Sequence, residues 1–207
     1  MLAVMEAASA QRTLPSDRAQ RIVDAMRRTV ARQGVEGSTF DRVAREAGVS
    51  RGLLHYYFGT KERLLVEVVR HDCELRLAML DEQLAPARSA DDLIAILAYA
   101  LEDLVRNDPE FFTVAYELFS LARRNEEIAG EVADVMRRQR DHVTEILIAK
   151  RDEGVLRLLA QPEAIAEVLF ALADGVALRM LTEPERDFAD TIAAGTAAVR
   201  GLLTDAA

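Results

Sequence analysis

Apolar residues recur along most of this chain at the three- and four-residue spacing of helices that bury one face. The expected helices cover about residues 16–33, 39–47, 51–57, 60–84, 90–106, 109–124, 125–151, 161–181 and 187–203. No strand-type alternation, internal repeat or low-complexity block interrupts the pattern. The sequence therefore predicts an all-α fold of about nine helices.

Two short helices and a tight turn, within residues 38 to 62, form the most specific pattern in the chain. In the first helix the apolar residues share one stripe: Phe40, Val43, Ala44 and Ala47. Ser38 or Thr39 is expected to cap this helix, and Asp41 completes a capping-box pattern with Ser38. Gly48 follows, because glycine takes positive φ at little cost, and Ser50 is expected to cap the second helix. This is a helix-turn-helix, whose second helix enters the DNA major groove.

The second short helix has an unusual outer surface. Leu54 and Phe58 are four residues apart and are expected to anchor it to the core. The positions left outside carry no carboxylate: Arg51, Gly52, Leu53, His55 and Tyr56. Such a surface suits a groove lined by phosphates, base acceptors and thymine methyl groups. Thr60 is expected to cap the next helix, with Lys61 in its first turn as a phosphate contact.

Residues 16–65 resemble the DNA-binding domain of the TetR family of bacterial transcriptional regulators. The resemblance is carried by Arg42-Val-Ala-Arg-Glu-Ala-Gly-Val-Ser-Arg-Gly and Leu54-His-Tyr-Tyr-Phe-Gly-Thr-Lys-Glu-Arg-Leu-Leu. It implies that Tyr56 and Lys61 hold phosphates, whereas His55 stands where tyrosine is commoner. The expected DNA-binding set is Thr39, Ser50, Arg51, Gly52, Leu53, His55, Tyr56 and Lys61. The resemblance also implies a homodimer on a palindromic operator and a small-molecule effector.

Charge divides the chain unevenly. The net charge is −9, yet residues 1–70 hold 12 Lys+Arg and 8 Asp+Glu, a net of +4, which leaves −13 for residues 71–207. The basic part coincides with the helix-turn-helix. The single cysteine, Cys73, excludes an internal disulfide and fits a reducing cytoplasm. No apolar run of transmembrane length and no signal peptide is recognised, so we expect a cytoplasmic protein without a membrane partner.

The middle helices hold most of the aromatic residues, and the last two are rich in alanine and glycine. The rings either fill a core or line a cavity for an apolar or aromatic effector, and the resemblance favours the cavity. The candidate ligand-binding residues are Tyr99, Phe112, Tyr116, Phe119, Met136 and Phe170. Glu117 and Asp174 are carboxylates among apolar neighbours, available to a cationic ligand, a water molecule or Arg179. The small residues indicate either a dimer interface through the last two helices or close packing within one chain.

Catalysis, a cofactor and a metal site are not expected. His55, His71 and His142 are scattered, and no cluster has metal-ligand spacing. We expect an arm over residues 1–15, a helix-turn-helix domain over 16–62 and an effector-binding and dimerisation domain over 63–207. The favoured function is a ligand-responsive repressor, with activation left open. The alternative is a helical module that binds a small molecule or a protein and does not bind DNA.

Overall fold

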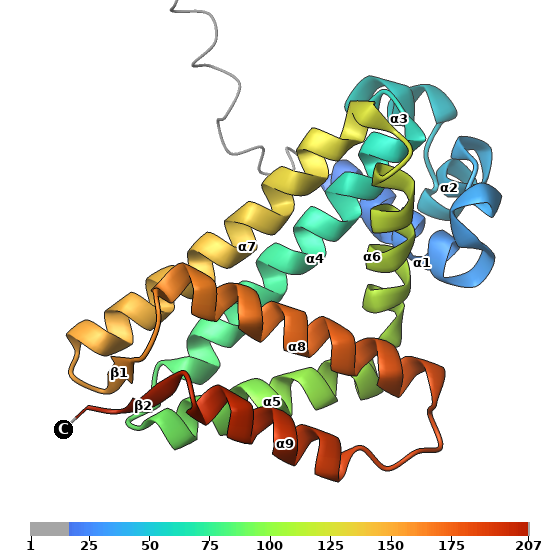
Figure 1. Ribbon diagram of the computed structural model, residues 1–207. Coiled ribbons are helices and arrows are strands. Elements are labelled where there is room, and N and C mark those ends of the chain that lie inside the picture. The colour runs from blue at the N-terminus through green and yellow to red at the C-terminus, as the bar shows by residue number, and fades with distance from the viewer. Residues whose placement is uncertain (1–16, 207) are drawn as a thin grey trace, which may run out of the picture. The chain divides into compact units, whose positions relative to one another are not determined.

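The periodic stretches fold as helices in the computed structural model, which describes residues 17–206 (Figure 1). The helices are α1 (Asp17–Gly37), α2 (Phe40–Ala47), α3 (Arg51–Phe58), α4 (Lys61–Leu84), α5 (Ala90–Asn107), α6 (Pro109–Ala122), α7 (Glu126–Asp152), α8 (Pro162–Thr182) and α9 (Ala189–Arg200). Two short strands, β1 (Leu156–Leu158) and β2 (Leu203–Asp205), complete this part of the chain. Within residues 17–206 the predicted all-α class and its nine helices are confirmed.

The chain divides into two compact units, with the boundary between Val68 and Val69. This boundary falls inside α4, a helix with no interruption from Lys61 to Leu84. The first unit contains α1, α2, α3 and the start of α4, and the second contains the remainder of α4 and all later elements. A single helix therefore contributes residues to both units.

The first unit has a core of aliphatic and aromatic side chains from all its helices. Its fully buried large side chains are Ile22, Met26, Leu54, Leu64 and Leu65. Burying such a side chain stabilises a fold by about 1.5–3 kcal/mol. The stripe predicted for α2 supplies Phe40 and Val43 to the same buried set. This core fixes α2 and α3 and leaves their other faces exposed.

The ends of α2 explain one correction to the sequence analysis. Thr39 caps the helix, since its Oγ1 accepts the Arg42 amide N–H. Ser38 is buried and instead donates its hydroxyl to the Gly34 carbonyl at 2.8 Å. The predicted capping box between Ser38 and Asp41 is therefore wrong, because the Ser38 side chain points back toward α1. Gly48 has φ 67°, the left-handed conformation predicted for the turn.

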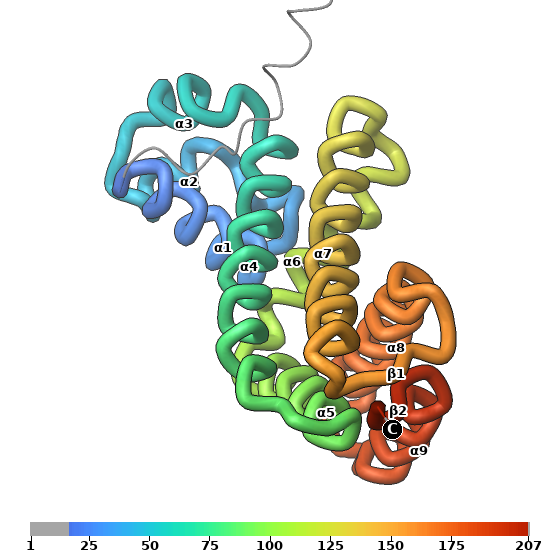
Figure 2. Tube along the Cα trace, turned by 90° about the vertical axis from the view of Figure 1, so that its left-hand side faces the viewer, coloured from blue at the N-terminus to red at the C-terminus, as the bar shows by residue number. Residues whose placement is uncertain are grey.

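The second unit is an assembly of helices around an aliphatic core. Figure 1 shows α8 and α9 beside α5, and α7 packs on α6 and α8. In both views α7 runs beside α4, and His142 of α7 lies 2.8 Å from the Asp81 carboxylate of α4 (Figure 2). Core residues from separated parts of the sequence include Leu93, Leu147, Ile165 and Val199. These contacts position the helices that carry most of the aromatic residues.

A small hairpin was not predicted from the sequence. β1 and β2 pair antiparallel, with Arg157 opposite Thr204. Three-residue strands are too short to show a period of two, and the helix predicted over residues 187–203 reaches the first residue of β2. That helix ends at Arg200, and Asp205 accepts the Ala90 amide N–H at 2.7 Å, which ties β2 to the start of α5.

Candidate functional site

The outer face of α3 is exposed. Leu54 and Phe58 are buried, as their spacing predicted. Arg51, Gly52 and His55 face outward, Leu53 is half-buried, and Tyr56 is 82 % exposed. Those outward residues contain no carboxylate, and exposing a tyrosine ring on a monomeric surface is unusual for a helix that only contacts water. The face is available to a partner.

Arg51, the first residue of α3, is held by two neighbours. Its Nη1 lies 3.2 Å from one carboxylate oxygen of Asp41 in α2. Its Nε donates to Nε2 of His55 at 3.4 Å, and the other ring nitrogen of His55 lies 3.1 Å from the Gly59 carbonyl. The His55 ring also packs edge-on against Phe40, with centroids 4.7 Å apart. The side chain expected to read a base therefore already has a fixed direction.

The remaining predicted DNA-binding residues lie at helix ends. Ser50 is exposed at the start of α3, but its hydroxyl makes no capping bond, so the predicted side-chain cap is wrong. Thr60 does cap α4, accepting the Arg63 amide N–H at 3.2 Å. Lys61 turns its ammonium toward the Val35 carbonyl at 3.0 Å. One of three ammonium hydrogens is used there, which leaves donors for a phosphate.

The second unit contains a cavity of about 1000 Å³ that is open to solvent. All six residues expected to bind an effector lie along it: Tyr99, Phe112, Tyr116, Phe119, Met136 and Phe170. They come from α5, α6, α7 and α8. Phe112 and Tyr116 stack at a ring distance of 5.9 Å, while Tyr99 is 64 % exposed at an edge of the unit. The sequence offered a core or a cavity, and the resemblance favoured the cavity; the rings both pack together and border a void.

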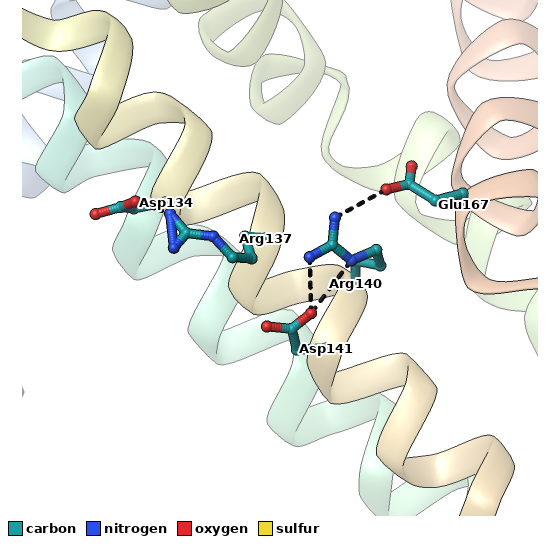
Figure 3. A network of polar contacts seen from close by, with 5 residues as sticks. All are labelled: Asp134, Arg137, Arg140, Asp141 and Glu167. Carbon is teal, nitrogen blue, oxygen red and sulfur yellow. Dashed lines mark hydrogen bonds and ion pairs between the residues drawn. The ribbon is translucent and has the colours of Figure 1, made fainter. Parts of the chain in front are cut away.

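Most charges along the cavity are compensated by ion pairs. Arg76 pairs with Asp108 and lies over the Phe111 ring at 4.3 Å. Arg140 of α7 bridges Asp141 on its own helix and Glu167 of α8, at 2.9 and 3.2 Å (Figure 3). The neighbouring Arg137 pairs with Asp134. A bound anion would therefore have to compete with a carboxylate at each of these arginines.

Asp174 of α8 lines the cavity without such an ion pair. Across the described residues, its carboxylate makes no hydrogen bond or ion pair; the Tyr116 hydroxyl donates instead to the Asp174 backbone carbonyl at 3.1 Å. Water reaches the side chain, yet the surrounding protein atoms desolvate it and raise its pKa. Desolvation, and then the Asp174 charge, raise the pKa of Tyr116 to about 12. Glu117 is exposed and outside the cavity lining, and neither Glu117 nor Arg179 pairs with Asp174.

Cys73 is buried in α4 beside the cavity and accepts a hydrogen bond from the Gln139 amide. Burial raises the pKa of its thiol to about 12, so the thiol stays protonated at neutral pH. A buried protonated thiol is a poor nucleophile. Cys73 is therefore a packing residue of α4.

Exposed apolar and small side chains follow one side of each of the last two helices. In α8 they are Val168, Ala171, Gly175 and Leu178, and in α9 they are Ala193, Ala194, Ala197 and Ala198. Close packing within one chain would bury these positions. They are the positions at which the sequence indicated either a dimer interface or close packing within one chain.

Within residues 17–206, no group of His, Cys, Asp and Glu could hold a metal ion. None of the helices described combines the length and hydropathy needed to cross a membrane.

Family models match the two parts of the chain. Residues 22–68 match bacterial regulatory proteins of the tetR family, and residues 89–204 match the C-terminal part of BetI-type transcriptional repressors. The second match alone covers more than half of the chain. The chain belongs to the TetR family.

Individual relatives agree with this assignment. The HTH-type transcriptional regulator BetI of Rhizobium meliloti (strain 1021) is 31 % identical over 129 residues, which are 61 % of this chain and 62 % of the relative. Among solved structures, FadR from Bacillus subtilis in complex with stearoyl-CoA has a TM-score of 0.70 at 18 % identity, covering 87 % and 95 % of the two chains. A regulator from Saccharomonospora viridis in complex with choline gives 0.66 at 20 %, covering 88 % and 93 %. At these identities the structures support the TetR-family fold.

Proposed function

We propose that this TetR-family protein is a homodimeric transcriptional repressor that a small molecule releases from a palindromic operator. The observation that carries the proposal is the outer face of α3, which is exposed, free of carboxylates and carries Arg51 and Tyr56. The neighbouring helix ends supply phosphate donors at Thr39, Ser50 and Lys61. A repressor of this kind binds the DNA beside the gene it controls.

The experiment is a binding titration with labelled DNA from upstream of the protein's own gene, for the wild type and Tyr56→Ala. Tyr56 is 82 % exposed, so its removal should not weaken the fold. Loss of its phosphate contact is expected to weaken binding by about 1 kcal/mol, or roughly fivefold. Leu159→Ala, at an exposed apolar position in the second unit, is the control. A wild type that binds none of this DNA would favour the alternative of a helical module without DNA-binding activity.

Homodimerisation through α8 and α9 is the second part of the proposal. Two half-sites of a palindrome need two recognition helices about 34–36 Å apart. The exposed small residues of α9 allow close helix approach, while Val168 and Leu178 of α8 supply apolar area, being 41 % and 47 % exposed. Replacement of Ala194 by glutamate is expected to dissociate the dimer, as measured by sedimentation. A monomeric wild type would contradict this part.

The third part concerns the effector, which we place in the cavity of the second unit. The rings lining the cavity favour an apolar or aromatic body, and the unpaired carboxylate of Asp174 favours a positively charged group. Stearoyl-CoA and choline are bound by structural neighbours of this chain, and choline has the charge that Asp174 requires. α4 contributes Arg76 and Leu77 to the cavity, and its first residues belong to the first unit, which contains the helix-turn-helix. α4 is therefore the element through which effector binding would be coupled to DNA binding.

The ligand class is tested by calorimetric titration with choline and, separately, with a fatty acyl-CoA. Choline is expected to bind and to lower DNA affinity, since a ligand shifts the equilibrium only if it favours the released state. Binding of the acyl-CoA alone would refute the cationic class and leave the cavity as the effector site. Binding of neither leaves no support for a choline-like ligand.

A further inference from the structure

Four residues of the helix-turn-helix form a chain of polar contacts on its exposed surface. Asp41 of α2 touches Arg51 of α3, Arg51 touches His55, and His55 touches the Gly59 carbonyl. All these side chains are exposed, so an ion pair among them contributes little to stability. Their arrangement therefore calls for another explanation.

The proton positions follow from the donors. An arginine Nε only donates, so Nε2 of His55 is the acceptor of the Arg51 contact. The proton of a neutral His55 then sits on Nδ1 and is donated to the Gly59 carbonyl at 3.1 Å. The ring is further oriented by Phe40, whose own side chain is buried. Both nitrogens of His55 are thus occupied, which argues against His55 itself reading a base.

Arg51 has donors to spare. A guanidinium carries five N–H groups. Nη1 contacts both oxygens of Asp41, at 3.5 and 3.2 Å, and Nε contacts His55. The two hydrogens of Nη2 have no protein partner in the described part of the chain. Nη2 is therefore the free edge of the guanidinium, and it can donate to the O6 and N7 acceptors of guanine in the major groove.

We propose that Asp41 and His55 are positioning residues that hold the free edge of Arg51 toward a guanine and away from the phosphates. The inference rests on the proposed DNA-binding function and names the base class that this site reads. Without Asp41, Arg51 samples many rotamers, and ordering such a side chain at an interface reduces affinity by roughly two- to tenfold. The loosened guanidinium also reaches backbone phosphates, which carry no sequence information.

The test measures discrimination between base pairs rather than affinity alone. The operator found upstream of the gene is compared with duplexes in which each G·C pair is replaced in turn. The pair of interest is the one whose replacement weakens the wild type and leaves Arg51→Ala unaffected. Asp41→Asn is expected to lower this discrimination ratio by about two- to tenfold. In the Arg51→Ala background the same change should leave the ratio unaltered.

Glu36→Gln is the matched control, because Glu36 is an exposed acid of the same unit that does not touch Arg51. Both variants remove one negative charge and should strengthen binding to all DNA alike, an effect that cancels in the ratio. His55→Phe, which keeps a ring against Phe40, should lower the ratio in the same direction as Asp41→Asn.

Two results would overturn the inference. An Asp41→Asn protein with tighter operator binding and an unchanged or higher ratio would mean that Asp41 sequesters Arg51. An equal fall in discrimination at the base pairs that Arg51 does not read would mean that Asp41 acts on the fold. By contrast, a wild type that binds no duplex refutes the proposed function itself, and the role of Asp41 with it.

Discussion

Replacing Asp174 by asparagine should change stability and ligand binding in opposite directions. The Asp174 carboxylate is desolvated by the surrounding protein and has no partner among the described residues, which raises its pKa. A raised carboxylate pKa means that the folded state disfavours the charge. The protonated acid contributes favourably to the free energy of folding below the pKa of the unfolded state, near 3.9. This contribution is lost as the pH rises through the pKa of the folded state. At neutral pH the wild type therefore carries a penalty that Asp174→Asn removes.

The magnitude is limited because water reaches Asp174 through the open cavity. We expect the variant to gain no more than about 1 kcal/mol at pH 7, or about 2–4 °C in Tm for a chain of this size. The gain should shrink as pH falls toward 4. The quaternary ammonium of choline has no N–H to donate, so its contact with the Asp174 carboxylate is an ion pair open to water, worth about 1 kcal/mol, and choline binding should weaken by roughly fivefold.

Thermal melting at several pH values and calorimetry with choline are the assays. Glu117→Gln provides the control, since Glu117 is exposed on α6 outside the cavity lining and loses the same charge. Equal choline affinity for wild type and Asp174→Asn would remove Asp174 from the ligand site. A variant less stable than wild type at pH 7 would refute the electrostatic reasoning.

Two further predictions concern the second unit. The buried ammonium of Lys150 donates to the Ala85 and Ala87 carbonyls at 3.3 and 3.4 Å and to Glu153 at 3.1 Å. Lys150→Met should therefore lower the free energy of unfolding, measured by urea denaturation, by about 2–3 kcal/mol. The control Arg151→Met, at an exposed position, should change it little. Burial raises the pKa of Cys73 to about 12, so at pH 8 about one thiol in ten thousand is ionised and alkylation should be negligible until the protein unfolds. The stability linked to this thiol should decline only as pH rises from about 9 toward 12, and fast alkylation of folded protein at pH 8 would contradict its burial.

Local patterns predicted the helices because each buries one stripe of its surface. The caps at Ser89 and Asn125 follow the same logic, as each side-chain oxygen accepts an amide N–H two or three residues later, at 3.0 Å. The β1–β2 hairpin was not predicted, because a strand of three residues is too short to show the alternation of apolar and polar side chains. Local sequence therefore determines helix position well and short strand pairing poorly.

Contacts between elements were beyond such patterns. Asp41 and Arg51 meet because the turn at Gly48 sets the angle between α2 and α3. Their ten-residue separation matches no helix or strand period, so the sequence does not predict the contact. The burial of Lys150 was not predicted either, because lysine is rarely buried and its sequence neighbours give no sign of it. Composition and spacing pointed to the rings and soft side chains that line the cavity, and the resemblance favoured a cavity over a core. A void depends on how completely the helices pack, which residue types do not specify.

The central claim, that the outer face of α3 meets DNA, is tested most directly by a thiol placed on it. Ser50→Cys is nearly isosteric at an exposed position without a side-chain hydrogen bond, and the native Cys73 is buried and protonated. Leu159→Cys, exposed in the second unit, is the reference. We predict that operator DNA slows alkylation of the thiol introduced at position 50 at least about tenfold, in line with occlusion by a specific complex. Equal alkylation rates at position 50 with and without bound DNA would contradict the account.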